Sequence, residues 1–232
     1  MVTIDDTPLP PLKDAAAVTR EAAAQTPAEG SEWREAMRLM DRRAFAPFLL
    51  AAAFLLIMPI DLILPQIAGV TMIVCGLGLL MGAAAPPLPW FVGKMKARKS
   101  SLEGLAKFFD EQSWAHLIVN PRMAEFSTGL GETMAALSIL ILGIEVTAPL
   151  PDLIPALGVL ALGLGLLQRD GLVMLIGVAV AIGWTAFLIA MAVGAHMNAP
   201  FASGWMSEHA GWALHFIAPR PAPQPASMGS AA

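Results

Sequence analysis

The chain has 232 residues, of which 56% are hydrophobic and only 14% are charged, and its mean hydropathy is +0.66. A soluble domain carries charge at about 25% of its positions, so this composition indicates an integral membrane protein. The net charge of −4 comes from scattered acidic residues, and the lack of a basic field excludes a nucleic-acid partner. Cys75 is the only cysteine, which excludes an intramolecular disulfide and a zinc cluster built on thiolates.

The N-terminal region predicts a tail followed by a short helix. Residues 1–30 are rich in Ala and Pro and are expected to be disordered, and they contain no apolar run that would predict a cleavable signal peptide. Residues 31–43 predict an amphipathic helix on the membrane surface, because Trp33, Met37 and Met40 fall on one helical face. A solvated helix without a lipid contact is the alternative, and the same apolar side chains could instead dock a partner protein.

Residues 44–89 predict the first of two units built as an apolar helix, a break and a second apolar helix. The break carries Asp61 between two prolines, and each flanking apolar run is short for a hydrocarbon core of about 30 Å. The two runs therefore either span the bilayer with the help of flanking residues or form a re-entrant hairpin. Gly78 and Gly82 form a GxxxG pattern, which predicts close helix packing.

Residues 90–126 predict an amphipathic segment that is too polar to span a bilayer. The segment opens with a cluster of basic residues between Lys94 and Lys99, and the other basic zone of the chain lies at or before Arg43. Basic residues that flank membrane spans concentrate on the cytoplasmic side. Both zones, and with them the N-terminus, are therefore expected in the cytoplasm.

Residues 127–197 predict the second helix–break–helix unit and a final transmembrane helix. The second break carries Asp152 at a place that matches Asp61 in the first unit. In the final helix, Gly183 and Gly194 supply small surfaces for helix packing. The expected fold is thus an all-α polytopic membrane bundle with about five transmembrane segments.

Residues 198–232 predict an interfacial aromatic stripe before a disordered tail. Trp205, Trp212 and Phe216 recur at helical spacing in this region. Large aromatic side chains beside a flexible terminus could anchor the chain in lipid or dock a partner protein. With five crossings, the C-terminus is expected in the periplasm.

Few residues could carry chemistry. Asp61 and Asp152 could bind a cation or relay protons at the helix breaks, or could simply cap the helices that follow them. Glu145, near the outer end of a spanning run, could act in the same way or reach the lipid headgroups. Arg169 and Asp170 are expected to form an interfacial turn. The spacing of reactive residues predicts no catalytic residues, no metal site and no cofactor.

Two parts of the chain carry a family resemblance. Residues 151–160 read PDLIPALGVL, residues 163–172 read GLGLLQRDGL, and residues 42–50 read RRAFAPFLL. The stretches at 151–160 and 163–172 closely resemble the hallmark segment of the ExoD family, bacterial inner-membrane proteins that are associated with exopolysaccharide synthesis. Residues 42–50 also resemble that family. The resemblance extends over about residues 33–193 and implies a pathway without a defined enzymatic reaction.

The expected function follows from the resemblance and from the sparse polarity of the apolar runs. The first expectation is a non-enzymatic accessory or scaffold protein of the bacterial inner membrane. Its partners would be the lipid bilayer and other membrane proteins of cell-envelope or exopolysaccharide physiology. The alternative is a small transporter, or a protein that handles ions or protons, using Asp61, Asp152 and Glu145.

Overall fold

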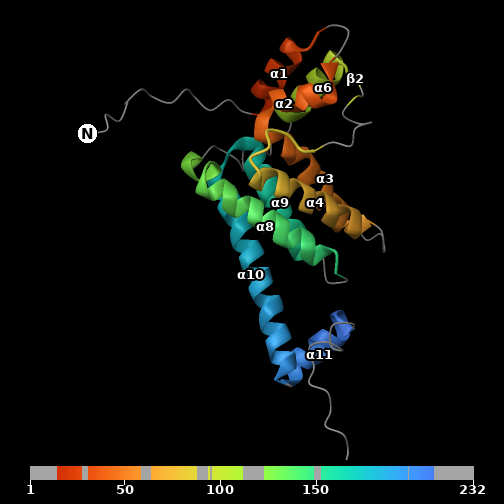
Figure 1. Cartoon of the computed structure of the whole chain (residues 1–232), viewed down its shortest axis with the longest axis vertical. Coiled ribbons are helices and arrows are strands. Elements are labelled where there is room, and N and C mark those ends of the chain that lie inside the picture. The colour runs from red at the N-terminus through yellow and green to blue at the C-terminus, as the bar shows by residue number, and fades with distance from the viewer. Residues whose placement is uncertain are drawn as a thin grey trace, which may run out of the picture. The chain divides into compact units, whose positions relative to one another are not determined.

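A computed structural model describes residues 15–27, 31–58, 64–87, 94, 96–111, 123–148, 153–197 and 199–211. The described residues are mostly helical, which confirms the all-α class, and their strands form one two-residue antiparallel ladder. The chain forms two compact units, Met1–Thr185 and Ala186–Ala232. In chain order (Figure 1) the elements are α1 (Ala15–Gln25), β1 (Ser31–Glu32), α2 (Trp33–Leu39), the 3-10 helix η1 (Asp41–Phe45), α3 (Ala46–Ile57), α4 (Leu64–Leu80), β2 (Lys96–Ala97), α6 (Lys99–Glu111), the 3-10 helix η2 (Ala124–Ser127), α8 (Leu130–Val146), α9 (Leu153–Gln168), α10 (Gly171–His196) and α11 (Pro200–His209).

The core of the first unit consists of the short helices α3, α4, α8 and α9. α4 packs along α8, α3 packs along α9, and α3 also contacts α4 (Figure 1). Pro47 lies in the first turn of α3, where its missing amide hydrogen costs nothing. Apolar residues on one side of α3 are buried against the other core helices: Leu49, Ala52, Ala53 and Leu56.

Glycines let α4 and α8 approach one another at backbone distance. A Cβ on Gly69 would lie 2.9 Å from the Gly143 carbonyl oxygen, and a Cβ on Gly143 would lie 3.0 Å from the Gly69 carbonyl oxygen. About two helical turns further along, a Cβ on Gly76 would lie 2.9 Å from the Leu140 amide nitrogen. Small residues at helix contacts are typical of membrane bundles, because tight packing replaces the hydrophobic driving force there.

Ends of three core helices meet at one end of the core. Arg42, just before α3, contacts Glu132 in the first turn of α8. Arg169, just after α9, contacts Asp41 at the start of η1. These contacts bring the starts of α3 and α8 and the end of α9 together. We call this the charged end, defined by Asp41, Arg42, Glu132 and Arg169.

The four glycines expected to pack against helices have different surroundings in the described part of the chain. Gly82 follows α4 with φ of +71°, and the Ala83 amide donates to the Gly78 carbonyl at 2.9 Å, so Gly82 terminates the helix. A Cβ on Gly82 or on Gly183 would have no heavy atom of the described residues within 4 Å. A packing role for these two glycines stays a prediction. Gly78 does lie in a close contact, because a Cβ there would be 3.0 Å from the Phe45 ring.

Helix length and composition decide which elements are candidates to cross a membrane. Among the described residues, α10 is the one helix that is long and apolar enough to span a bilayer, whereas α4 and α9 are apolar but shorter. The first part of α10 packs on α9, since a Cβ on Gly177 would lie 2.6 Å from the Leu162 side chain. The expected five crossings stay a prediction.

The outer faces of the core helices are apolar as well as the inner ones. Exposed large apolar side chains lie on α4, α8, α9 and α10, among them Ile67, Val70, Val74, Leu77, Leu137, Ile141, Ile144, Leu157, Ile176 and Ile182. A soluble protein seldom exposes so continuous an apolar surface, whereas a lipid-facing surface requires one.

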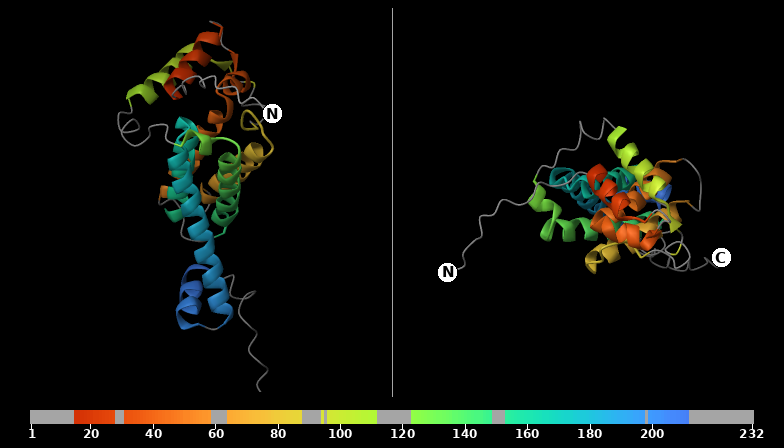
Figure 2. Two further views of the ribbon diagram at one scale, coloured as in Figure 1. Left: turned by 90° about the vertical axis from the view of Figure 1, so that its left-hand side faces the viewer. Right: turned by 90° about the horizontal axis from the view of Figure 1, so that it is seen from above.

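A small helical cap lies beside the core at the N-terminal side of α3. Figure 2 shows α1 and α6 side by side, and the β1–β2 ladder joins the start of α2 to the start of α6. Trp33, Met37 and Met40 pack within this cap, where Met37 and Met40 form a buried cluster with Ala22 of α1. The predicted surface helix thus turns its apolar face toward α1 and not toward lipid. The expected disorder of residues 1–30 is wrong for Ala15–Gln25, because helix α1 forms there and packs on α6.

The second unit has its own aromatic cluster. The Phe187 and Trp205 rings meet edge to face with centroids 5.1 Å apart, and Trp205 stacks on His209 at 4.8 Å. Gly194 lies against α11, because a Cβ there would be 2.7 Å from the Ala202 Cβ. Trp205 is therefore half-buried by residues of its own unit. Trp212 and Phe216, also expected in the aromatic stripe, lie outside the described residues.

Candidate functional site

The charged end is built where the chain reverses direction after α2. α2 ends at Leu39, and Asp41 adopts a left-handed conformation with φ of +54°. Asp and Asn tolerate this conformation better than most residues, because their short side chains can bond locally. The turn leads directly into η1, which presents Arg42 and Arg43 at the start of α3.

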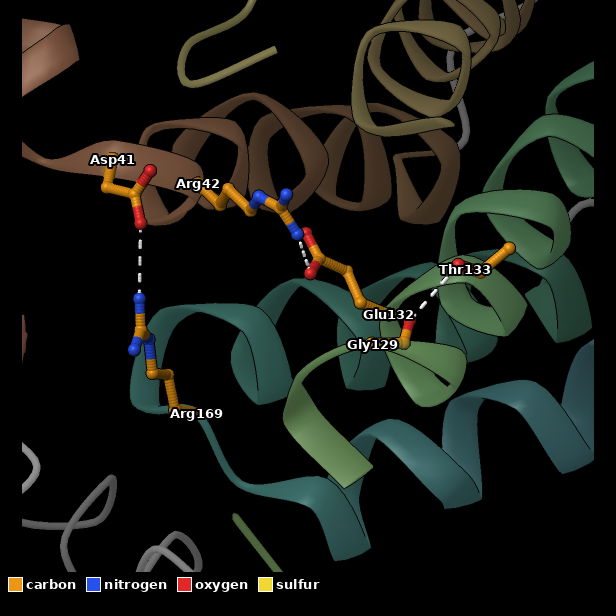
Figure 3. Close-up of polar contacts among 6 residues, drawn as sticks. All are labelled: Asp41, Arg42, Gly129, Glu132, Thr133 and Arg169. Carbon is orange, nitrogen blue, oxygen red and sulfur yellow. Dashed lines mark hydrogen bonds and ion pairs between the residues drawn. The ribbon is translucent and has the colours of Figure 1, made fainter. Parts of the chain in front are cut away.

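Arg42 and Glu132 form the central ion pair of the charged end (Figure 3). Only 6% of the Glu132 side chain is exposed, whereas 41% of the Arg42 side chain is exposed. Glu132 lies in the first turn of α8, where the helix dipole stabilises a negative charge. The pair joins the start of α3 to the first turn of α8. The Glu132 Oε1 atom is buried and has no hydrogen-bond partner among the described residues.

A second ion pair links the end of α9 to η1. An Arg169 terminal nitrogen lies 3.2 Å from an Asp41 carboxylate oxygen (Figure 3). Arg169 also has φ of +54°, and the Asp170 amide donates to the Gly165 carbonyl at 3.0 Å, which closes α9 in the same way as Gly82 closes α4. Because both partners are substantially exposed, this pair contributes at most about 1 kcal/mol and serves mainly to orient Arg169.

Asp170 is part of the junction between α9 and α10, not of an exposed turn. The residue is only 1% exposed, and its Oδ1 accepts hydrogen bonds from the Leu172 and Val173 amides at 2.9 and 3.2 Å. A carboxylate in this position caps the first turn of α10. The predicted turn at Arg169 and Asp170 thus exists, but its acid is buried as a helix cap.

Two hollows adjoin at the charged end. One is a cleft of about 320 Å³ whose charged lining residues are Asp41, Arg42, Arg43, Glu132 and Arg169. The other is a groove of about 330 Å³, lined by Met123, Phe126, Thr128, Leu130 and Gly131. Thr128 lines both hollows, so a charged cleft and a largely apolar groove meet at this residue.

Of the acids predicted to handle ions, the structure describes Glu145, which lies away from the charged end. Glu145 lies near the opposite end of α8, half-buried, and its carboxylate accepts a hydrogen bond from Thr185 of α10. Its Oε2 atom is buried without a hydrogen-bond partner among the described residues. Asp61 and Asp152 lie outside the described residues. No group of three or more His, Cys, Asp or Glu side chains in the described part of the chain could hold a metal ion.

The sequence interpretation missed the residues that form the charged end. It treated Arg42 as the end of a surface helix, and it did not pair Glu132 with any residue. The pair is separated by 90 positions, so no local spacing connects the two residues. The available signal was an acid in the first turn of an apolar run, together with adjacent arginines at the start of another.

The structure is thus that of an all-α protein with apolar outer faces and an ion-paired end. A model of the family described as "Exopolysaccharide synthesis, ExoD" matches residues 16–190. The chain therefore belongs to the ExoD family, and the match includes the cap, the core helices and every residue of the charged end. The match ends before α11. No curated protein and no solved structure matches the chain significantly.

Proposed function

We propose that this ExoD-family protein is a non-enzymatic component of the bacterial inner membrane that supports exopolysaccharide synthesis by associating with other membrane proteins. The observation that carries the proposal is the apolar outer surface of α4, α8, α9 and α10. Such a surface is compatible with lipid or with the apolar faces of neighbouring membrane helices. Family membership supplies the link to exopolysaccharide synthesis.

The charges of the core support a structural role rather than a reactive one. Arg42 and Glu132 pair across two helices, and Arg169 pairs with Asp41. A general acid or base needs a titratable group held within reach of a substrate, and a nucleophile needs an adjacent base. These carboxylates instead serve as partners for arginines. The ion pairs would hold the two helix–break–helix segments together while their outer faces remain available.

The distribution of basic residues supports a cytoplasmic position for the charged end. Arg42, Arg43 and Arg169 lie there, and the basic residues between Lys94 and Lys99 precede α6 of the cap. Basic flanks favour the cytoplasmic side of the membrane. In this orientation α10 starts at the cytoplasmic face and leads the chain toward the periplasm.

Deletion of the gene in its native bacterium, followed by complementation, tests the link to the pathway. We expect the deletion to lower secreted exopolysaccharide, measured as hexose per cell mass, and the wild-type gene to restore it. Complementation with Trp205→Ala and Trp212→Ala tests the C-terminal stripe as a docking element. We expect this variant to insert normally but to lose co-purifying membrane proteins. Normal exopolysaccharide in the deletion strain would contradict the proposed role.

A second candidate function is ion or proton handling, and one observation favours it. The Glu145 Oε2 atom is buried among apolar helices without a hydrogen-bond partner among the described residues. Acids at membrane depth commonly mark ion or proton routes. Purified protein in liposomes should show an ion or proton flux that Glu145→Gln abolishes if this candidate is correct. Equal leak from wild-type and empty liposomes would remove it.

A further inference from the structure

We propose that the charged end binds an anionic lipid, with its phosphate headgroup in the charged cleft and a hydrocarbon chain in the adjoining groove. The proposal rests on the membrane residence inferred above, but not on a role in exopolysaccharide synthesis. It assigns one amphiphilic occupant to two hollows that meet at Thr128.

The charge balance of the cleft favours an anion. Three guanidinium groups line it, from Arg42, Arg43 and Arg169, against the two carboxylates of Asp41 and Glu132. The formal charge of these five side chains is +1. The contact with Asp41 uses one terminal nitrogen of Arg169, and a guanidinium has five N–H donors. Arg169 can thus keep Asp41 as a partner and still donate to phosphate oxygens, which arginine contacts in a bidentate manner.

The backbone of α8 adds to the attraction. Gly129, the residue that precedes the helix, lines the cleft and makes no side-chain cap for the first turn. The amides at a helix start carry partial positive charge and bind phosphate oxygens well. Thr128, the residue before Gly129, also lines the cleft. Glu132 offsets part of this field, but its charge is already matched by Arg42.

The groove favours a lipid over a free phosphate. Met123 and Leu130 are exposed to 55% and 78% and line an apolar hollow next to the charged one. A free phosphate would leave this groove unoccupied, whereas an acyl chain would cover its apolar surface. The sequence order explains why the two hollows meet. Gly129 and Glu132 face the cleft, and Leu130 and Gly131 between them face the groove.

The test is lipid retention by the full chain purified in a neutral detergent. Phosphatidylglycerol and phosphatidylcholine are added separately, and bound lipid is counted by native mass spectrometry. We expect phosphatidylglycerol to be retained at least tenfold more strongly than phosphatidylcholine. The variant Arg169→Gln removes a donor that is one-third exposed, and we expect it to lower phosphatidylglycerol retention about fivefold to tenfold. The matched control Arg38→Gln, on the exposed side of α2, should change nothing.

A second variant examines the groove separately. Leu130→Ser changes an exposed side chain, so we expect the fold to persist and the retention of phosphatidylglycerol to fall. Thermal unfolding of each variant without lipid verifies folding. Equal retention of both lipids, or equal retention by Arg169→Gln and Arg38→Gln, would overturn the proposal. Full displacement of phosphatidylglycerol by inorganic phosphate at millimolar concentration would also overturn it and indicate a soluble anion. None of these measurements depends on exopolysaccharide production.

Discussion

Arg169 has two roles that can be separated at the level of the single residue. Its backbone ends α9 in a left-handed conformation with φ of +54°, and its side chain contacts Asp41. The conformation is unfavourable for any residue with a Cβ, by about 1–2 kcal/mol. An arginine can occupy such a position when the contacts of its side chain offset the cost of the backbone conformation. The left-handed backbone of Arg169 is an outlier of this kind, and it indicates that the side chain of this residue has a role.

Replacing Arg169 with glycine should leave stability unchanged or raise it slightly. Glycine relieves the left-handed strain by about 1 kcal/mol, and the loss of an exposed ion pair costs at most about 1 kcal/mol. The same substitution at Arg38, in the last turn of α2, should lower stability by up to about 1 kcal/mol. Thermal unfolding in detergent compares the two variants. Clear destabilisation by Arg169→Gly without a matching loss in Arg38→Gly would show that losing the ion pair costs more free energy than relieving the backbone strain gains.

The Arg42–Glu132 pair should behave as a coupled unit. Arg42→Gln leaves a carboxylate nearly buried without its cation, so we expect a loss of about 1–3 kcal/mol. Glu132→Gln removes the charge that needs pairing and should cost less. The double variant should be no less stable than Arg42→Gln alone. Additive losses in this double-mutant cycle would contradict the pairing.

Sequence patterns predicted the elements better than their contacts. The apolar runs, the breaks between them and the amphipathic helix after Lys99 could be recognised locally, because each depends on periodicity and punctuation by Pro and Gly. Helix α1 could not, because its alanine-rich sequence gains a buried face only through packing on α6. The same limit applies to Gly69 and Gly143, which lie in helices that meet only after the chain has folded back.

Alanine substitutions at two glycines should change the stability of the protein in opposite directions, and one of these glycines lies in the α4–α8 contact. Gly143→Ala would place a Cβ 3.0 Å from backbone atoms of α4, so we expect the helices to be forced apart at a cost of about 1–3 kcal/mol. Gly183→Ala meets no atom of the described residues within 4 Å and should stabilise α10 by up to about 1 kcal/mol through helix propensity. Both variants are compared by thermal unfolding in the same detergent. Equal tolerance of both would show that the close approach is not needed.

The whole molecule is an ExoD-family protein with exposed apolar side chains on its helices and an ion-paired end. Composition alone predicted the membrane environment, since charged residues are too few for a soluble surface. The charged end could not be predicted, because it unites η1, the start of α8 and the end of α9. The cytoplasmic position proposed for it rests on the basic residues gathered there.

Sided cysteine labelling in membrane vesicles tests this placement most directly. Cys75 is buried and is replaced first by Ala, so that each introduced thiol is unique. We expect Lys99→Cys to react with a membrane-impermeant maleimide from the cytoplasmic side and Ser207→Cys from the opposite side. Val74→Cys, on the exposed apolar face of α4, should not react from either side. Reaction of Lys99→Cys and Ser207→Cys from the same side, or free reaction of Val74→Cys, would contradict the account.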